Sequence, residues 1–375
     1  MMITFIPIVI LLVYVFIIQW YRYEWNKYAG FMPAMKGIQV PVSVVVAFRN
    51  EVRNMETLVL SLRKQAYPAD KFEVILVNDH SEDGSEIKAL ELCRTLPNFR
   101  VINNPNLPGG KKSALEAGIR CSLNELIITT DADCTFQPEW IDTLAGFYRD
   151  EQPDMIIGPV DITCEPGFFG KYQEVEFLSL VASGAGAAAA ERPIYCNAAC
   201  FAFRKSLFFE MNDPLNLKVV SGDDTFFLHA VKRMRGKKIR LLKSYNAVAT
   251  TLGFASVKEY MDQHRRWVSK SIHYRDPDVI LTAVTVLLVN LCVFVSAVLL
   301  VAGFNCWLFP LLFSGKAFND YLMVRDYMRF CRKKTSPKEF LAFSAVYPVF
   351  TLWISITGLV TGTQWKGRPN KPSIG

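Results

Sequence analysis

Long apolar stretches lie on either side of a region in which apolar runs alternate with charged segments. The first stretch, residues 2–20, carries no charged side chain. About twenty predominantly apolar residues cross the hydrocarbon core of a bilayer as a helix. The stretch lacks the basic segment and the small-residue cleavage site of a cleaved signal peptide. We therefore predict an N-terminal transmembrane anchor over residues 1–21.

Apolar segments return towards the C-terminus, at residues 279–304, 307–324 and 340–360. Lys316 and Asp320 interrupt the second segment, but residues four apart on a helix can pair on one face and need not face lipid. Pro348 is the expected break in the third segment, so a re-entrant hairpin or an interfacial segment stays open. The sequence predicts a membrane region of two to three helices over residues 278–361, and then a basic tail over residues 362–375.

Basic residues after the first apolar stretch set the expected topology. Arg22, Lys27 and Lys36 follow it, and positively charged loops favour the cytoplasmic side of a membrane. We expect a multi-pass protein of the inner cell membrane, with the domain after the first span in the cytoplasm.

In the central region, short apolar runs alternate with helical patterns. Runs at residues 42–46, 73–77, 100–102 and 126–128 predict strands, and residues 54–65, 85–96 and 113–122 predict the helices between them. This alternation predicts an α/β domain over residues 40–275, with a mostly parallel sheet covered by helices on both faces. Such sheets bind ligands at the carboxyl ends of their strands.

Polar residues directly follow three of the predicted strands: Asn50 and Glu51, then Asp79, then Asp131 and Asp133. Residues two apart on a strand share one face, so Asp131 and Asp133 are expected to point the same way. Paired carboxylates suit a hard cation such as Mg²⁺ or Mn²⁺, which keeps positions open for phosphate oxygens. A solvated turn is the alternative for an isolated Asp-x-Asp. The convergence of these polar residues on one edge of the sheet favours a ligand-binding site.

Composition narrows the expected partners. The net charge of +7 is modest, and fits contact with anionic lipid better than binding of nucleic acid. The nine cysteines and four histidines show no metal-type spacing, so we expect reduced thiols and no zinc site. Gly109-Gly-Lys-Lys112 lacks the Walker spacing, and no dinucleotide fingerprint follows the first strand. Lys111 or Lys112 can instead neutralise a diphosphate.

Ser221-Gly-Asp-Asp224 opens a predicted helix at residues 225–234. Acidic residues at such a start can serve as caps. Alternatively, Asp223 or Asp224 acts as a general base that takes a proton from an attacking hydroxyl.

Gln263, Arg266 and Trp267 share one face of a predicted amphipathic helix at residues 256–273. Arginine offers a planar donor fork for phosphate, and tryptophan offers a flat surface for a ring. An interfacial anchor helix is the alternative. Residues 167–190 are expected to form either an ordinary packed helix or an aromatic surface that guides a lipid.

Together these segments resemble the family 2 glycosyltransferases of the inverting GT-A type. The motifs are Arg49-Asn-Glu51, the loop Val77-Asn-Asp-His-Ser-Glu-Asp-Gly-Ser85, Gly110-Lys-Lys-Ser-Ala-Leu115, the DxD segment Thr130-Asp-Ala-Asp133, Asp223-Asp224 at the place of "ED", and the QxxRW segment Gln263-His-Arg-Arg-Trp267. The resemblance covers residues 42–271. Asp223 replaces the usual glutamate, and Cys196-Asn-Ala-Ala-Cys200 replaces the acceptor-loop GxN pattern, which leaves the acceptor unpredicted.

The resemblance implies a GT-A, Rossmann-like fold and a role for each matching residue. The expected nucleotide-sugar ligands are Glu51, Asp79, Lys111 and Asp131, and the expected metal ligands are Asp131 and Asp133. Asp224 is the expected base. Asp223, Gln263, Arg266 and Trp267 are expected to contact the diphosphate and the acceptor.

The implied reaction is metal-dependent transfer of a sugar, with inversion, from a nucleotide-diphosphate sugar to a membrane lipid. UDP is the commonest donor nucleotide of the family, and ceramide-type glucosyltransferases are the most similar members. A processive polysaccharide synthase is the alternative, although three or four spans hardly line a polysaccharide channel. A non-catalytic membrane scaffold is a third reading, which the intact aspartates disfavour.

Overall fold

The computed structural model describes residues 2–33, 38–107, 109–216, 222–304, 307–360, 363–365 and 368–370. Lys36, Ser221 and most of the predicted basic tail therefore lie outside the described residues. The chain divides into two compact units that interleave along the sequence. The sheet unit comprises Ala29–Thr163 and Tyr195–Leu252, and the helical unit comprises Met1–Tyr28, Cys164–Ile194 and Gly253–Gly375. The predicted domain boundaries stay predictions.

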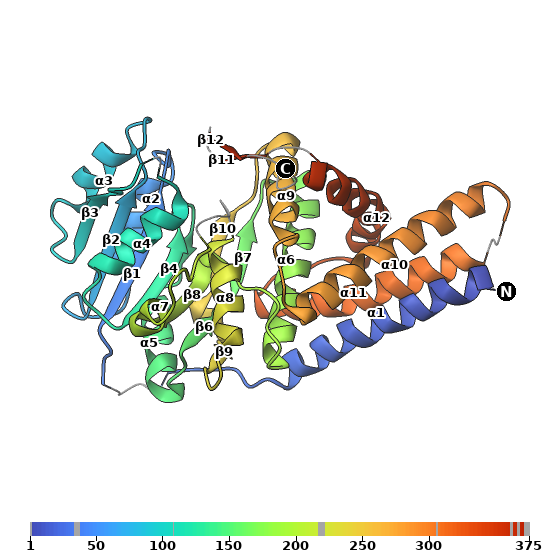
Figure 1. Ribbon diagram of the computed structural model, residues 1–375, viewed down its shortest axis with the longest axis horizontal. Helices are drawn as coiled ribbons and strands as arrows, with labels where there is room; N and C mark the ends of the chain where they lie inside the picture. Colours follow the sequence, from blue (N-terminus) through green and yellow to red (C-terminus); the bar gives the residue numbers. More distant parts are fainter. Residues whose placement is uncertain are drawn as a thin grey trace. The chain divides into compact units, whose positions relative to one another are not determined.

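A seven-stranded mixed sheet forms the centre of the sheet unit, in the order β3-β2-β1-β4-β8-β6-β9. Its strands are β1 (Val42–Phe48), β2 (Phe72–Asn78), β3 (Phe99–Asn103), β4 (Leu126–Asp131), β6 (Met155–Ile157), β8 (Phe201–Arg204) and β9 (Ile239–Leu241). The first four strands run parallel, as predicted, and β8 runs antiparallel to β4 and β6. The predicted α/β class with a mixed sheet is confirmed (Figure 1).

Helices cover the parallel strands and explain why those strands are largely apolar. The helices of this unit are α2 (Met55–Arg63), α3 (Ser85–Cys93), α4 (Lys111–Cys121), α5 (Trp140–Glu151), α7 (Lys205–Phe209) and α8 (Asp223–Arg233). Helix α4 approaches the sheet closely at Gly118, where an added Cβ would lie 2.4 Å from Cγ1 of Val45 and 2.9 Å from Cγ2 of Val77. Any larger side chain would push the helix off the sheet.

The register brings the carboxyl ends of the parallel strands to one edge. Phe48 of β1 lies opposite Asn78 of β2, and Ala47 lies opposite Asp131 of β4. The polar residues that follow these strands therefore leave the sheet together. A smaller sheet, of β5 (Thr135–Phe136), β10 (Ala249–Leu252) and β7 (Val160–Thr163), pairs in the order β5-β10-β7.

Long helices make up most of the helical unit. They are α1 (Met2–Lys27), α6 (Phe168–Ala189), α9 (Val257–Ser271), α10 (Pro277–Val301), α11 (Leu308–Phe330) and α12 (Pro337–Val360), and the short strands β11 (Thr363–Trp365) and β12 (Arg368–Asn370) follow them. Helices α1 and α6 meet at Gly186, where an added Cβ would lie 2.7 Å from Cβ of Tyr21. Glycine at this position therefore allows the two helices to touch.

Three helices among the described residues are long and apolar enough to cross a membrane: Phe5–Lys27, Pro277–Val301 and Pro337–Val360. Helix α11 lies outside this set, and its Lys316 and Asp320 form the predicted ion pair at 2.6 Å. The expected break at Pro348 is wrong, because α12 continues through that residue. Pro348 is buried, and packing against neighbouring helices offsets the one backbone hydrogen bond that proline removes.

Candidate active site

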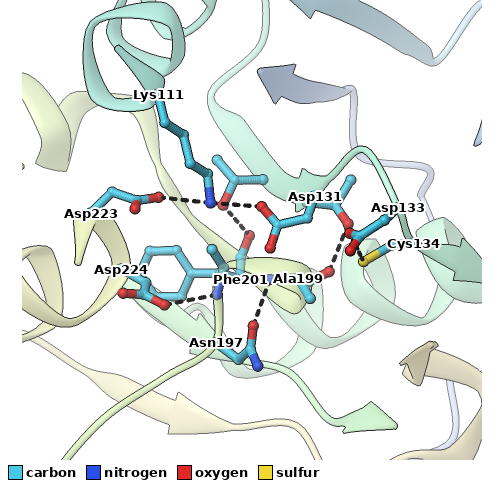
Figure 2. A network of polar contacts seen from close by, with 12 residues as sticks. Lys111, Asp131, Asp133, Cys134, Asn197, Ala199, Phe201, Asp223 and Asp224 are labelled. Atoms are coloured by element: carbon cyan, nitrogen blue, oxygen red, sulfur yellow. Dashed lines mark hydrogen bonds and ion pairs between the residues drawn. The ribbon is translucent and has the colours of Figure 1, made fainter. Parts of the chain in front are cut away.

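Lys111 connects two acidic segments of the sheet unit. It is the first residue of α4, and its Nζ lies 2.6 Å from Oδ1 of Asp131 and 3.4 Å from Oδ2 of Asp223. Figure 2 shows the lysine reaching between the two carboxylates. Burial alone would lower the pKa of Lys111, but the charges of Asp131 and Asp223 outweigh it and raise the pKa. The lysine is therefore a fixed positive charge at the carboxyl end of β4.

Lys112 has a different environment although it is the next residue. Its side chain is buried, and its Nζ donates to the carbonyl oxygens of Leu215 and Asn216 at 2.6 and 3.0 Å. The same nitrogen lies 4.8 Å from the centre of the Phe226 ring. Lys112 therefore holds backbone, whereas Lys111 contacts the predicted site carboxylates Asp131 and Asp223.

Asp133 lies in a region of concentrated negative charge. Its Oδ2 accepts a hydrogen bond from Thr251 of β10 at 3.2 Å. Burial, followed by the charges of Asp131 and Glu51, raises the pKa of Asp133 to about 6. Like charges that crowd a buried carboxylate have this effect, and a cation beside Asp133 would relieve it.

A divalent cation fits these residues. Mg²⁺ is commonly bound in proteins by one or two carboxylates, with substrate phosphates completing its shell. Among the described residues, no three His, Cys, Asp or Glu side chains are grouped to enclose a metal. Asp131 and Asp133 therefore suit an ion that is shared with a ligand rather than caged by protein.

The loop after β2 is held tightly around Asp79. This carboxylate is buried and accepts hydrogen bonds from the Asn104 amide at 2.8 Å and from the Gly110 backbone N–H at 2.9 Å. Arg49 donates to the carbonyl oxygens of Asp79 and His80 at 2.9 and 2.6 Å. The predicted motifs at the ends of β1 and β2 are thus joined by direct hydrogen bonds.

Glu51 lies in the loop that follows β1. Its backbone N–H donates to Oγ of Ser85 at 2.7 Å, and its carboxylate accepts from the Asn54 side chain at 2.7 Å. The contribution of Glu51 to the pKa of Asp133 places both acids in one electrostatic environment. The structure therefore brings the ends of β1 and β4 together, as the sequence predicts.

Asp223 and Asp224 are the first two residues of α8. Asp223 is buried, whereas Asp224 is half-buried. Oδ2 of Asp224 accepts from the backbone N–H of Ala198 at 3.0 Å (Figure 2), and its Oδ1 accepts from the N–H of Thr225 at 2.6 Å. Acidic side chains in the first turn of a helix lie near the positive end of its dipole. Asp224 lies in the first turn of α8, whose N-cap is Gly222 without a side-chain cap hydrogen bond, and it is the more accessible of the two acids.

The turn at residues 197–199 is a part of the site that side-chain patterns did not indicate. Oδ1 of Asn197 accepts from the Ala199 N–H at 3.0 Å, and this turn presents the Ala198 N–H to Asp224. Thr130 in β4 donates to the Ala199 carbonyl at 2.7 Å. The only sequence signal was the departure of this segment from the family pattern.

The residues Gln263, Arg266 and Trp267 lie on α9, in the helical unit. Arg266 donates to Oε1 of Gln263, so the two side chains share one face of the helix, as predicted. The Trp267 ring packs against the His264 ring with their centres 4.7 Å apart.

Residues 43–210 match the family model "Glycosyl transferase family 2". The glycosyltransferase AglE of Haloferax volcanii is 25% identical over 126 residues, which are 34% of this chain and 41% of that protein. Dolichyl-phosphate beta-glucosyltransferase ALG5A of Trichomonas vaginalis is 30% identical over 114 residues, which are 29% of this chain and 35% of that protein. The chain thus matches less than half the length of either relative.

Among solved structures, mannosyltransferase PcManGT of Pyrobaculum calidifontis, in complex with GDP-Man and Mn²⁺, has a TM-score of 0.57. The comparison covers 92% of this chain and 99% of that one, at 18% sequence identity. It shows that the two chains share a fold.

Proposed function

We propose that this chain, whose residues 43–210 match the glycosyl transferase family 2 model, moves a sugar from a nucleotide-diphosphate sugar to a lipid acceptor with inversion of configuration. The observation that carries the proposal is the cluster in which Lys111 lies between Asp131 and Asp223. It supplies one fixed cation and several carboxylates at the strand ends where ligands of such sheets bind.

The donor is assigned to the carboxyl ends of β1, β2 and β4. Glu51 and Asp79 would hold the nucleoside, and Lys111 would contact the diphosphate. Asp131 and Asp133 would hold Mg²⁺ or Mn²⁺, which neutralises charge on the diphosphate when it is bound. Lys111 stabilises the same developing charge, since a preorganised cation acts strongly where water is excluded.

Asp224 is the proposed base. Its carboxylate takes the proton of the acceptor hydroxyl, whose oxygen then attacks the anomeric carbon. The bond between that carbon and the diphosphate oxygen breaks on the opposite face, and the nucleoside diphosphate leaves with the bonding electrons. One displacement through an oxocarbenium-like transition state inverts the anomeric configuration. Asp223 is less suited to this role because it is buried and lies 3.4 Å from Lys111.

Two observations support a lipid as the acceptor. In the part of the chain that the structure describes, three helices are long and apolar enough to cross a membrane, and one relative is named for action on dolichyl phosphate. We assign the protein to the inner cell membrane as a multi-pass protein with its sheet unit in the cytoplasm. Gln263, Arg266 and Trp267 would contact the diphosphate and the acceptor from α9.

The test is transfer by the purified protein in detergent with Mn²⁺, a membrane lipid extract and labelled UDP-sugars or GDP-mannose. A discrete labelled species in the organic phase would support the proposal, and its mass would identify sugar and lipid. Label in an aqueous polymer would indicate polysaccharide synthesis instead of transfer to a lipid. Absence of transfer from every donor by wild type, with normal nucleotide binding, would overturn the enzymatic assignment.

A further inference from the structure

Helix α6 holds the backbone that leads into α9. Gln173 is buried on α6, and its side-chain amide pairs with both polar atoms of Phe254. Its Nε2 donates to the Phe254 carbonyl at 3.0 Å, and its Oε1 accepts from the Phe254 N–H at 2.8 Å. Ser256 then caps α9 by accepting from the Glu259 N–H at 3.2 Å. The start of α9 is therefore fixed to α6 by two side-chain hydrogen bonds.

One turn further along α6, Glu176 reaches the middle of α9. Its Oε1 lies 3.2 Å from Nε2 of His264, and the two side chains are 3% and 7% exposed. Nδ1 of His264 lies 2.8 Å from the carbonyl oxygen of Tyr260. The carbonyl accepts a hydrogen bond and the carboxylate lies at ion-pair distance, so this arrangement favours a histidine that carries a proton on each nitrogen.

Aromatic rings surround this pair and limit its freedom. The rings of Tyr260 and Phe350 lie 4.2 and 5.1 Å from the His264 ring, between centres. Glu176 also raises the pKa of Tyr260, after the larger effect of burial. A charge pair enclosed in this way has few alternative positions, because leaving its partner would strand a buried charge.

His264 belongs to the segment Gln263–Trp267, and its ring is the surface against which Trp267 packs, at 4.7 Å. Gln263 precedes His264 directly, and Arg266 donates to Gln263. An orientation imposed on the His264 ring is thus passed to Trp267 by direct packing.

We propose that Glu176 is a positioning residue for the reaction: by holding His264, it fixes the rotation of α9 and the place of Trp267 within the Gln263–Trp267 segment. The inference rests on the proposed function for its catalytic consequence, and on the contacts within the helical unit for its structural part. A misplacement of about 1 Å far from the reacting atoms can lower a rate about 10²-fold. Glu176 therefore controls turnover although no reaction step is assigned to it.

The test compares Glu176→Ala and Glu176→Gln with the matched control Glu174→Ala. Glu174 lies on the same helix but pairs with Lys171 and Lys333 at 2.5 and 2.9 Å. We expect Glu176→Ala to lower kcat by about 10- to 100-fold, with little change in the KM of the nucleotide sugar. Glu176→Gln keeps an acceptor oxygen for His264 and should recover most of kcat. Glu174→Ala should stay near wild type.

A second measurement is independent of turnover. Hydrogen exchange of the backbone amides at residues 263–267 should accelerate in Glu176→Ala and remain as in wild type in Glu174→Ala. Unchanged exchange, or a kcat within about twofold of wild type in a folded Glu176→Ala protein, would overturn the positioning role. If wild type transfers no sugar while exchange still accelerates, the proposed function fails and the structural role of Glu176 stands.

Discussion

The ammonium group of Lys111 lies 2.6 Å from Oδ1 of Asp131, so the first turn of α4 is tied to the carboxyl end of β4. This ion pair gives the site a positive charge before any ligand arrives. A nucleotide diphosphate brings its own negative charges and would compete with Asp131 for the lysine. The pair of Lys111 and Asp131 therefore keeps a positive charge in place that an anionic ligand can bind.

Replacement of Lys111 by methionine should weaken donor binding. Loss of a hydrogen bond to a charged group costs about 1.5–3 kcal/mol, which corresponds to an increase in the Kd of the nucleotide sugar of about 10- to 100-fold. Calorimetric titration measures it. The control is Lys71→Met, which changes an exposed lysine of the same unit that pairs with Asp70. Equal affinity in Lys111→Met and wild type would remove Lys111 from the donor site.

Replacement of Lys112 by methionine should lower stability. The change leaves the carbonyl oxygens of Leu215 and Asn216 without this donor, and an unsatisfied buried acceptor costs about 1–3 kcal/mol. A lower Tm, measured by thermal unfolding in detergent, is the expected result, again against Lys71→Met. A Tm equal to that of the control would show that Lys112 is not needed to hold this backbone.

Asp224→Asn should abolish transfer and spare donor binding. A positioned base contributes about 10²- to 10⁴-fold to the rate, and asparagine keeps the shape and the hydrogen bond from Ala198. Single-turnover kinetics and nucleotide titration separate the two effects. Asp150→Asn changes an exposed aspartate on α5 that pairs with Arg149, and serves as the control. Substantial turnover in Asp224→Asn would move the base to another residue, with Asp223 the next to examine.

Asp133→Asn should remove the response of donor binding to metal. In wild type, Mn²⁺ should tighten binding of the nucleotide sugar and a chelator should weaken it. In the variant the two conditions should give the same Kd. Thr251→Val removes the 3.2 Å hydrogen bond to Asp133 but keeps the carboxylate, so it should still respond to Mn²⁺. An intact metal response in Asp133→Asn would contradict a ligand role.

The buried pair of Glu176 and His264 predicts a pH dependence of stability. Burial alone would lower the pKa of His264, but Glu176 outweighs it and the pKa is raised. The folded state therefore binds a proton more tightly than the unfolded state, whose histidine pKa is about 6.5. The stability from this pair is complete below that value and is lost as the pH rises through the raised pKa of the folded protein.

The measurement is the Tm of wild type and of His264→Gln across this pH range. Among the described residues, the ionisable side chains near the pair include Tyr172 and Tyr260. Burial and then Glu176 raise the pKa of both tyrosines, so their phenols stay neutral over the range. We expect the difference in Tm between the two proteins to shrink as the pH rises. A constant difference would mean that His264 does not titrate there.

Much of the sheet unit follows from local pattern. The strands at residues 42–48, 72–78 and 126–131 are largely apolar because helices cover both faces of the sheet. Parallel pairing then requires that the acids after them meet at one edge. By contrast, β6 and β9 are three residues long, which is too short for any periodicity. The antiparallel insertion of β8 depends on contacts between distant segments that a local pattern does not contain.

The candidate site likewise has parts that the sequence predicts and parts that it does not. Carboxylates at strand ends can be predicted because their chemistry and spacing are visible in the sequence. The different roles of Lys111 and Lys112 could not be predicted, since two adjacent lysines are chemically equal and differ only by a rotation of about 100° around the helix axis. The N–H of Ala198 is backbone and carries no sequence signal. Glu176 is one of two acids on α6, and only tertiary packing separates it from Glu174.

The N-terminal helix α1 is a candidate membrane span, and at Gly186 it also supports a neighbouring helix. At this glycine α6 contacts Tyr21 of α1. Helix α6 also contacts α9 and the backbone before it, through Glu176 and Gln173. Helices α1 and α9 thus both pack against α6. Replacing α1 with a foreign hydrophobic segment would leave α6 without its neighbour and loosen α9. We therefore expect homologues to exchange the candidate membrane helix α1, α6 and α9 together or not at all.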